Sequence, residues 1–203
     1  MGLAEKIKTG LNQLSLSMTD AQIDKSLNYL DLLCRWNKVT NLTGVSELEE
    51  MVSVHLMDSL SIASFVTGKT ILDVGSGAGL PGIPLALLHE DKGFTLLDSN
   101  GKKTRFMMQA KIDLGLTNVE VVKARVEDFS GSFDHIVCRA FRQLDEFVQV
   151  TLPLLAPDGT LLAMKGPVEQ GDLERQDIHC ELHELMVPGI KAQRYLIELS
   201  LCQ

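Results

Sequence analysis

The residues with the clearest chemical pattern form a glycine-rich segment between two apolar runs. Residues 71–84 read ILDVGSGAGLPGIP, which predicts a strand, a tight loop and the first turn of a helix. Glycine permits positive φ angles and places no Cβ in the path of a ligand. The free N–H groups and the positive dipole end at the start of a helix favour a carboxylate or a phosphate. The segment therefore predicts a ligand-binding loop.

The spacing of these glycines discriminates between cofactors. A nicotinamide-binding loop has the pattern G-x-G-x-x-G, whereas here three glycines alternate with other residues and an acid stands two positions upstream. This pattern favours S-adenosylmethionine, whose carboxylate suits backbone N–H groups and whose ammonium suits an acid. A second acid is expected about 20 residues further on, to bind the ribose hydroxyls. The residues predicted to contact the cofactor are Asp73, Gly75, Ser76, Gly77, Ala78, Gly79 and Asp98.

Composition and charge exclude several classes of protein. The chain has 203 residues, of which 45% are hydrophobic, enough for one domain with an appendage. No apolar stretch approaches the roughly 20 residues that span a bilayer, and the first residues lack the apolar centre of a signal peptide. We therefore expect a cytoplasmic protein without a membrane partner. A net charge of -8 provides no long-range attraction for nucleic acid, so any polyanion must bind a local basic patch.

The cysteines and histidines favour no metal site. His179, Cys180 and His183 lie close together, but no second cysteine pair accompanies them, so we expect a role without metal. Reduced thiols, rather than disulfides, fit cysteines without a C-x-x-C pair. The four cysteines are Cys34, Cys138, Cys180 and Cys202.

The periodicity of the apolar residues divides the chain into two units. Residues 1–66 are predicted to form an N-terminal helical cap, and residues 67–203 a methyltransferase domain that uses S-adenosylmethionine. The cap helices are expected at residues 3–14, at residues 19–37 with a capping box at Thr19 and Gln22, and at residues 46–65 with one at Ser46 and Glu49. Residues 37–44 are polar and predict a loop.

Strands and helices alternate after residue 67, as a parallel sheet requires. The predicted strands are residues 70–74, 93–98, 119–122, 133–138, 159–164, 181–187 and 193–201, and the predicted helices are residues 81–89, 102–114, 144–155 and 169–176. Seven strands that end in a hairpin predict an α/β fold: a Rossmann-like class I S-adenosylmethionine-dependent methyltransferase with a helical cap. Its ligand is expected at the carboxyl ends of the strands, where their order reverses.

The residues after the fourth predicted strand indicate the methyl acceptor. Cys138-Arg139-Ala140-Phe141 contains neither the Asp/Asn-Pro-Pro-aromatic run of amino methyltransferases nor a Pro-Cys pair. Cys138 as a nucleophile for pyrimidine C5 is the alternative to a buried thiol. A purine ring nitrogen such as guanine N7 has a free lone pair and loses no proton on attack. Positioning without a general base then suffices.

Several segments together resemble one family, the bacterial RsmG or GidB (glucose-inhibited division protein B) methyltransferases of 16S rRNA. The resemblance implies that the acceptor is N7 of a guanine in the 530 loop of 16S rRNA, within the small ribosomal subunit. By position, the resemblance implies that Gly75, Leu80, Val126, Glu127 and Arg139 contact the cofactor. The tail after Arg194 lacks the terminal lysine that is usual in this family. The segments are Trp36-Asn37, Asn41-Leu42-Thr43, His55-x-x-Asp58-Ser59, residues 73–84, Asp98-Ser99, Lys102-Lys103, Arg139-Ala140 and Leu161-x-x-x-Lys165-Gly166.

A set of basic residues is predicted at the ligand rim. Arg139 and Lys165 are the candidate catalytic residues, Lys165 by holding an RNA phosphate. Because N7 methylation creates a cationic purine, we expect Arg139 to face a carboxylate, phosphate or carbonyl rather than that ring. The candidate RNA-binding residues are Lys102, Lys103, Arg105, Arg125, Arg142, Lys165 and Arg194, with solvated helix faces as the alternative.

Other functions stay open at this point. The alternatives are a methyltransferase for another RNA, a protein or a small molecule, a nicotinamide-dependent oxidoreductase, and a cofactor-binding protein without catalysis. We expect a monomer that prefers assembled small subunits to naked RNA with a shallow salt dependence, because the acidic chain must rely on shape. Trp36 either stacks near the RNA or closes the core of the cap.

Overall fold

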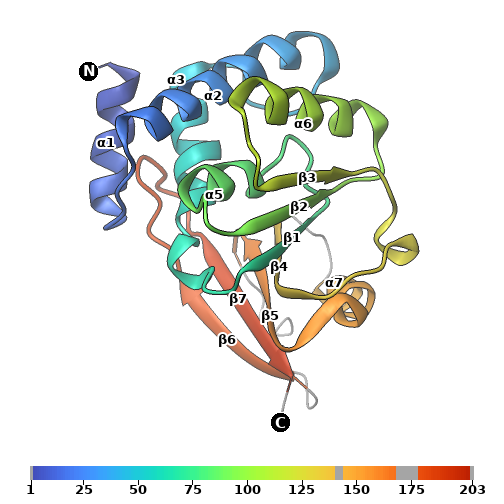
Figure 1. The fold of residues 1–203 in the computed structure, drawn as a ribbon. Coiled ribbons are helices and arrows are strands. Elements are labelled where there is room, and N and C mark those ends of the chain that lie inside the picture. Colours follow the sequence, from blue (N-terminus) through green and yellow to red (C-terminus); the bar gives the residue numbers. More distant parts are fainter. Residues whose placement is uncertain (1, 140–143, 168–177, 202–203) are drawn as a thin grey trace.

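The computed structural model describes residues 2–139, 144–167 and 178–201, and its centre is a seven-stranded sheet (Figure 1). The strand order is β3-β2-β1-β4-β5-β7-β6. The first five strands are parallel, β7 runs antiparallel to β5, and β6 runs antiparallel to β7. The strands are β1 (Thr70–Val74), β2 (Gly93–Leu97), β3 (Val119–Val122), β4 (Phe133–Arg139), β5 (Leu155–Lys165), β6 (Ile178–Glu184) and β7 (Tyr195–Leu201).

Helices cover both faces of this sheet (Figure 1). α5 (Gly82–Leu88) and α6 (Gly101–Leu114) connect β1, β2 and β3, whereas α7 (Leu144–Thr151) lies between β4 and β5 in the chain and on the opposite face. The connections therefore proceed outward in both directions from the β1–β4 pair. This is the reversal of strand order at which open α/β sheets bind ligands.

Alternation along β1 separates two apolar cores. Ile71 belongs to the core shared with α5, α6 and the N-terminal helices, while Leu72 and Val74 belong to the core beneath α7. Asp73 points to the same side as Ile71, because side chains alternate along a strand. A carboxylate is thereby placed in the larger core, directly beneath the glycine loop.

The N-terminal helices pack on the face that carries α5 and α6 (Figure 1). They are α1 (Leu3–Gln13), α2 (Asp20–Thr40), α3 (Leu48–Met51) and α4 (Asp58–Leu60), with a π-helical turn, η1 (Val52–Met57), between α3 and α4. Trp36 of α2 meets Phe106 of α6 edge to face, with ring centroids 5.7 Å apart. Trp36 thus joins the cap to the sheet domain, and the division at residue 66 stays a prediction.

Several predicted boundaries agree with the structure, and others were wrong. The capping box at Thr19 and Gln22 is confirmed. The box at Ser46 and Glu49 is not formed: Glu47 stands at the N-cap of α3 without a side-chain cap, and the Ser46 hydroxyl contacts the Glu47 carboxylate. α2 continues to Thr40, beyond the predicted end near residue 37, because Asn41 takes the left-handed conformation that ends it.

The strand ends near the C-terminus also differ from the prediction. β5 begins at Leu155 rather than at residue 159, and β6 begins at Ile178 rather than at residue 181. A turn around Gly189, with φ +83°, separates β6 from β7 and ends β6 before residue 187. The predicted helix at residues 169–176 lies outside the described residues. Among those described, none of the helices is both long and apolar enough to cross a bilayer.

Candidate functional site

The glycine loop adopts the conformation that its sequence predicts. Gly75, Gly77 and Gly79 have φ angles of +70°, +62° and +79°, which side chains with a Cβ rarely adopt. The N–H of Gly75 donates to the carbonyl of Leu97 at the end of β2, at 2.8 Å. The Gly77 N–H donates to the Asp98 carboxylate at 3.0 Å. The loop is therefore held across the carboxyl ends of β1 and β2.

The glycines of this segment serve two purposes. A Cβ added to Gly75 has no neighbour within 4 Å, and one added to Gly77 meets only ordinary contacts. A Cβ on Gly79 instead collides with Ile83, and one on Gly82 collides with Leu96. The first two glycines leave room for a ligand, whereas the last two permit close packing of α5 on the sheet.

Asp73 lies beneath the loop rather than on its surface. The carboxylate is fully buried, and its Oδ2 accepts a hydrogen bond from the Gly82 N–H at 2.8 Å, while its Oδ1 has no hydrogen-bond partner in the described part of the chain. Burial raises the pKa of Asp73 to about 7. The predicted contact with a cofactor ammonium has no direct support in this arrangement, in which Asp73 fixes the start of α5.

Residues from three strand ends form a cleft of about 390 Å³ beside the loop, which we call the loop cleft. The Asp98 carboxylate is held there by the N–H groups of Gly77 and Asn100, at 3.0 and 2.8 Å. Its lining includes Gly75, Asp98, Ser99, Lys103, Arg125, Val126 and Glu127, so four predicted cofactor contacts come together. Ser76, Ala78 and Leu80 are buried instead and shape the loop from below.

The cap supports the loop through a tyrosine that the sequence did not single out. The Tyr29 hydroxyl of α2 donates to the Ala78 carbonyl at 2.6 Å, and the side chain is fully buried. A buried carbonyl that loses its donor costs free energy of unfolding. The conformation of the loop therefore depends on the cap as well as on its own glycines.

A second cleft, of about 590 Å³, lies between the cap and the ends of β4, β5 and β6, and we call it the arginine cleft. Arg139 and Arg194 both bind the buried carboxylate of Asp58, Arg139 Nη1 at 3.2 Å from Oδ2 and Arg194 Nε at 3.1 Å from Oδ1. Arg139 Nη1 also donates to the Val54 carbonyl at 3.1 Å. Arg139 thus faces a carboxylate and a carbonyl, both from the protein, and its role in the reaction stays a prediction. The cleft is lined by Val54, His55, Asp58, Arg139, Met164, Lys165, Gly166, Pro167, Leu185, Arg194 and Tyr195.

Two residues of the π-helical turn η1, Val54 and His55, line this cleft. Such turns are rare and often mark functional positions. His55 lines the cleft and contacts the Thr43 hydroxyl through Nε2 at 2.7 Å, and its buried Nδ1 has no partner among the residues that the structure describes. Burial, with Arg139 nearby, lowers the pKa of His55 to about 4, so the imidazole is neutral at pH 7. His55 and Asp58 were quoted only as part of a family resemblance and were missed as site residues.

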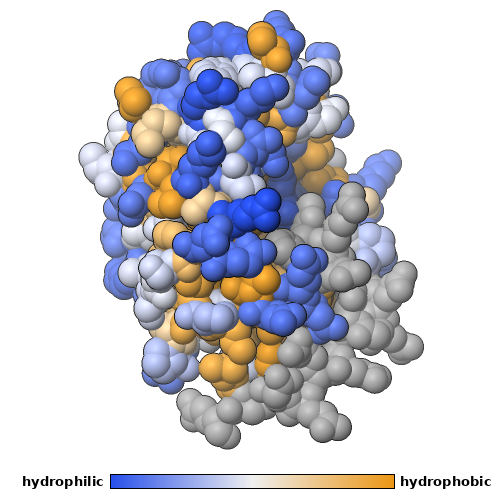
Figure 2. Space-filling view, turned by 90° about the vertical axis from the view of Figure 1, so that its right-hand side faces the viewer, coloured by the Kyte–Doolittle hydropathy of each residue, from blue (hydrophilic) through white to orange (hydrophobic). Residues whose placement is uncertain are grey.

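The predicted basic residues divide among three locations. Lys103 and Arg125 line the loop cleft, with the Lys103 ammonium 3.6 Å from the Asp98 carboxylate, and Lys165 lines the arginine cleft with Arg139 and Arg194. Lys102 and Arg105 lie exposed on α6, and Arg142 lies outside the described residues. Figure 2 shows the side of the molecule that lies to the right in Figure 1. Hydrophilic residues are mixed there with exposed hydrophobic ones.

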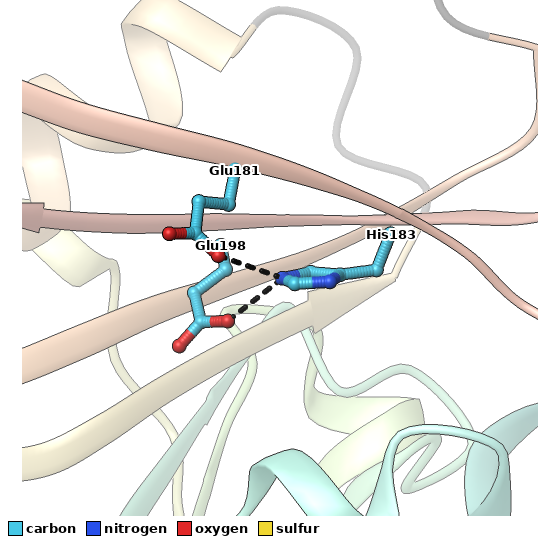
Figure 3. A group of neighbouring side chains, drawn as sticks. All are labelled: Glu181, His183 and Glu198. Carbon is cyan, nitrogen blue, oxygen red and sulfur yellow. Dashed lines mark hydrogen bonds and ion pairs between the residues drawn. The ribbon is translucent and has the colours of Figure 1, made fainter.

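The structure bears on two alternative chemistries, a cysteine nucleophile and a metal site. Cys138 is buried, and burial raises the pKa of its thiol, so it does not fit the nucleophile of pyrimidine C5 chemistry. On the terminal hairpin, His183 Nε2 lies 2.9 Å from Glu198 and 3.7 Å from Glu181 (Figure 3). These groups could hold a metal ion but already satisfy one another in pairs. The absence of a metal site stays a prediction.

Comparison with known proteins decides the family. The model of the family described as rRNA small subunit methyltransferase G matches residues 22–197. The chain belongs to this family. The ribosomal RNA small subunit methyltransferase G of Stutzerimonas stutzeri is 48% identical over 97% of this chain and 94% of its own length. The ribosomal RNA small subunit methyltransferase G of Laribacter hongkongensis is 47% identical over 99% of this chain and 100% of its own length.

Solved structures agree on the fold. Magnesium protoporphyrin IX methyltransferase from Synechocystis, solved with bound S-adenosylmethionine, superposes with a TM-score of 0.61 at 17% identity, over 92% of this chain and 99% of that one. At that identity the likeness shows a common fold alone. The predicted family, the class I methyltransferase fold and the rRNA methyltransferase activity are confirmed.

Proposed function

We propose that this chain transfers the methyl group of S-adenosylmethionine to N7 of a guanine in the 530 loop of 16S rRNA. The observation that carries the proposal is the pair of clefts at the reversal of strand order, one beside the glycine loop and one between Arg139 and Arg194. In the transfer, the N7 lone pair forms a bond to the methyl carbon while the carbon–sulfur bond breaks and its electrons stay on sulfur. No proton leaves the guanine, so the reaction needs alignment rather than a general base.

The loop cleft is proposed to hold the cofactor. The missing side chain of Gly75 leaves room for the methionine end of the cofactor, since a Cβ added there meets no described atom within 4 Å. Asp98 retains oxygen lone pairs for ribose hydroxyls, because each carboxylate oxygen accepts more than one hydrogen bond. Val126 and Glu127 line the far end of the cleft and suit the adenine ring.

The arginine cleft is proposed to hold the RNA beside the target base. Its basic residues, Arg139, Lys165 and Arg194, provide donors for phosphate oxygens. A guanidinium stacked on the methylated guanine would oppose the positive charge that develops there. We therefore assign these groups to phosphates or other acceptors around the base, with Lys102, Lys103, Arg105 and Arg125 as further contacts.

The proposed partner is 16S rRNA within the assembled small subunit, bound by a monomer in the cytoplasm. A net charge of -8 gives the protein no long-range attraction for RNA. Affinity must then come from shape and from a few phosphate contacts, which predicts a shallow dependence on salt. Trp36 packs against Phe106 and is half-buried, which favours its role in closing the cap over stacking on RNA.

Methylation of purified small subunits tests the proposal. Subunits that lack the modification are incubated with the protein and labelled S-adenosylmethionine, and the RNA is then cleaved at N7-methylguanine by borohydride and aniline. A single cleavage within the 530 loop is expected, at a rate well above that for a protein-free 530-loop hairpin. Methylation at another atom or outside the loop would contradict the proposal, and equal rates on hairpin and subunit would contradict the reliance on shape.

A further inference from the structure

Asp58 joins three segments that lie far apart in the sequence. It begins α4 in the cap, and its two carboxylate oxygens bind Arg139, 81 residues away at the end of β4, and Arg194, 136 residues away just before β7. Only 4% of Asp58 is exposed. The carboxylate is therefore a fixed structural centre for two guanidinium groups.

Within residues 2–139, 144–167 and 178–201, each arginine uses only part of its N–H donors for protein contacts. Arg139 uses Nη1 for Asp58 and Val54, while Arg194 uses Nε for Asp58 and Nη1 for the Gln193 carbonyl. Among the described residues, the Nη2 groups of the two arginines have no protein acceptor. About a quarter of each side chain remains exposed, at 23% and 28%, and both line the arginine cleft.

The charge of this cluster favours an anion. Two guanidiniums and one carboxylate leave a net charge of +1 on a protein whose total is -8. Two guanidiniums that share one carboxylate repel each other, so their common orientation depends on that carboxylate. Guanidinium N–H pairs match phosphate oxygens in geometry, and a partly buried site strengthens such hydrogen bonds.

We propose that Asp58 is a positioning residue, which orients Arg139 and Arg194 so that their outward N–H groups bind one phosphate of the RNA backbone. This inference rests on the proposed function, which requires RNA in the arginine cleft. It goes further in assigning the two arginines to a single phosphate and in giving that site a carboxylate in the cap as its organiser.

Asp58→Asn separates positioning from simple attraction. Removal of a negative charge should by itself strengthen the binding of any polyanion, whereas loss of the organiser should weaken it. We expect Asp58→Asn to bind a fluorescently labelled oligouridylate about tenfold more weakly in an anisotropy titration. The slope of log affinity against log salt should fall by about 0.7 for each lost phosphate contact. Affinity equal to or higher than that of the wild type would overturn the inference.

Asp31→Asn is the matched control, because Asp31 also pairs with an arginine, Arg35, at 3.1 Å, but on the exposed surface of α2. It makes the same change of charge away from the cleft, and its affinity for the oligouridylate should be unchanged or slightly higher. A decrease equal to that of Asp58→Asn would overturn the inference.

Two further variants show whether Asp58 acts through its arginine. Asp58→Asn should have little additional effect in an Arg194→Gln background, whereas additive losses would contradict a positioning role. If Asp58→Asn does not fold, Arg194→Lys decides the question: it keeps the charge but not the planar fork, and should weaken binding several-fold. Unchanged affinity in Arg194→Lys would overturn the inference.

The oligouridylate contains no guanine, so its binding does not depend on methylation. A wild-type protein that binds it normally but leaves the 530 loop unmethylated would refute the proposed function and leave the phosphate site standing. A wild-type protein that methylates the loop, with Asp58→Asn unaffected in both assays, would refute the phosphate site alone.

Discussion

The loop cleft and the arginine cleft are built in different ways. The loop cleft is formed around backbone: glycines with positive φ and the ends of β1, β2 and β3, which follow one another along the chain. The arginine cleft is formed by side chains from the cap, β4 and the start of β7, joined at Asp58. The proposed cofactor site thus comes mainly from consecutive units of the sheet, whereas the proposed acceptor site needs segments from both ends of the chain.

Gly77→Val should have the largest effect and tests the backbone part of this contrast. A branched side chain at φ +62° strains the loop and enters the space above it. Calorimetry should then detect no binding of S-adenosylmethionine, and the wild type should bind no nicotinamide cofactor.

Gly115→Val provides the matched control, because Gly115 has nearly the same φ, +63°, at the end of α6 and no neighbour within 4 Å. It should lose a similar amount of stability and still bind the cofactor. Unchanged affinity in Gly77→Val, or NAD binding by the wild type, would count against the assignment of the loop cleft.

Arg139→Ala should have the second-largest effect and tests the arginine cleft, which is formed by side chains. Loss of a charged hydrogen-bonding group typically costs about 1.5 to 3 kcal/mol, which corresponds to a roughly 10- to 150-fold lower rate of methylation. Asp58 keeps Arg194 as a partner, so thermal stability should fall only modestly, because the Val54 carbonyl loses its donor. Normal stability together with full activity would show that Arg139 has no part in the reaction.

His55→Gln should change how stability depends on pH. The pKa of His55 in the folded protein is about 4, below its ordinary value of 6.5, so the unfolded chain binds the proton more readily. The contribution of His55 to the free energy of unfolding is complete above pH 6.5. It is lost as the pH falls toward 4, by at most about 3 kcal/mol. Denaturant titrations at pH 7 and pH 4.5 should show that the free energy of unfolding decreases less with acidification in the variant than in the wild type. Equal decreases would indicate that His55 is not held neutral.

Tyr29→Phe should have the smallest effect and tests whether the cap helps to shape the loop cleft. The Ala78 carbonyl would lose its donor, at a cost of about 1 to 2 kcal/mol in the free energy of unfolding. We expect cofactor affinity to fall a few-fold and chemical denaturation to occur at lower denaturant. If stability falls but cofactor affinity is unchanged, the cap stabilises the fold without shaping the cleft.

The contrast between the clefts also explains how far the sequence could be interpreted. β1 and β3 were predicted residue for residue, and the glycine conformations followed from the spacing, because these features depend on neighbouring residues. The burial of Asp73 was predictable as well, since it shares the Ile71 side of β1. Its predicted contact with the cofactor rests on the position of an acid before a glycine loop and stays a prediction.

Tyr29 and Asp58 were beyond the reach of sequence patterns. The Tyr29 hydroxyl meets a carbonyl 49 residues away, and Asp58 meets arginines 81 and 136 residues away. Neither residue breaks a helical pattern, and neither stands in a motif whose spacing implies its partner. Only the packing of the cap on the sheet brings these groups together.

Mapping of 16S rRNA methylation in cells tests the central claim most directly. Cells without the gene are complemented with the wild type or with Gly77→Val, and total RNA is cleaved at N7-methylguanine. We predict one cleavage in the 530 loop that disappears with the gene, returns with the wild type and does not return with Gly77→Val. Cleavage that persists without the gene, or that returns in full with Gly77→Val, would contradict the assignment of both activity and cofactor site.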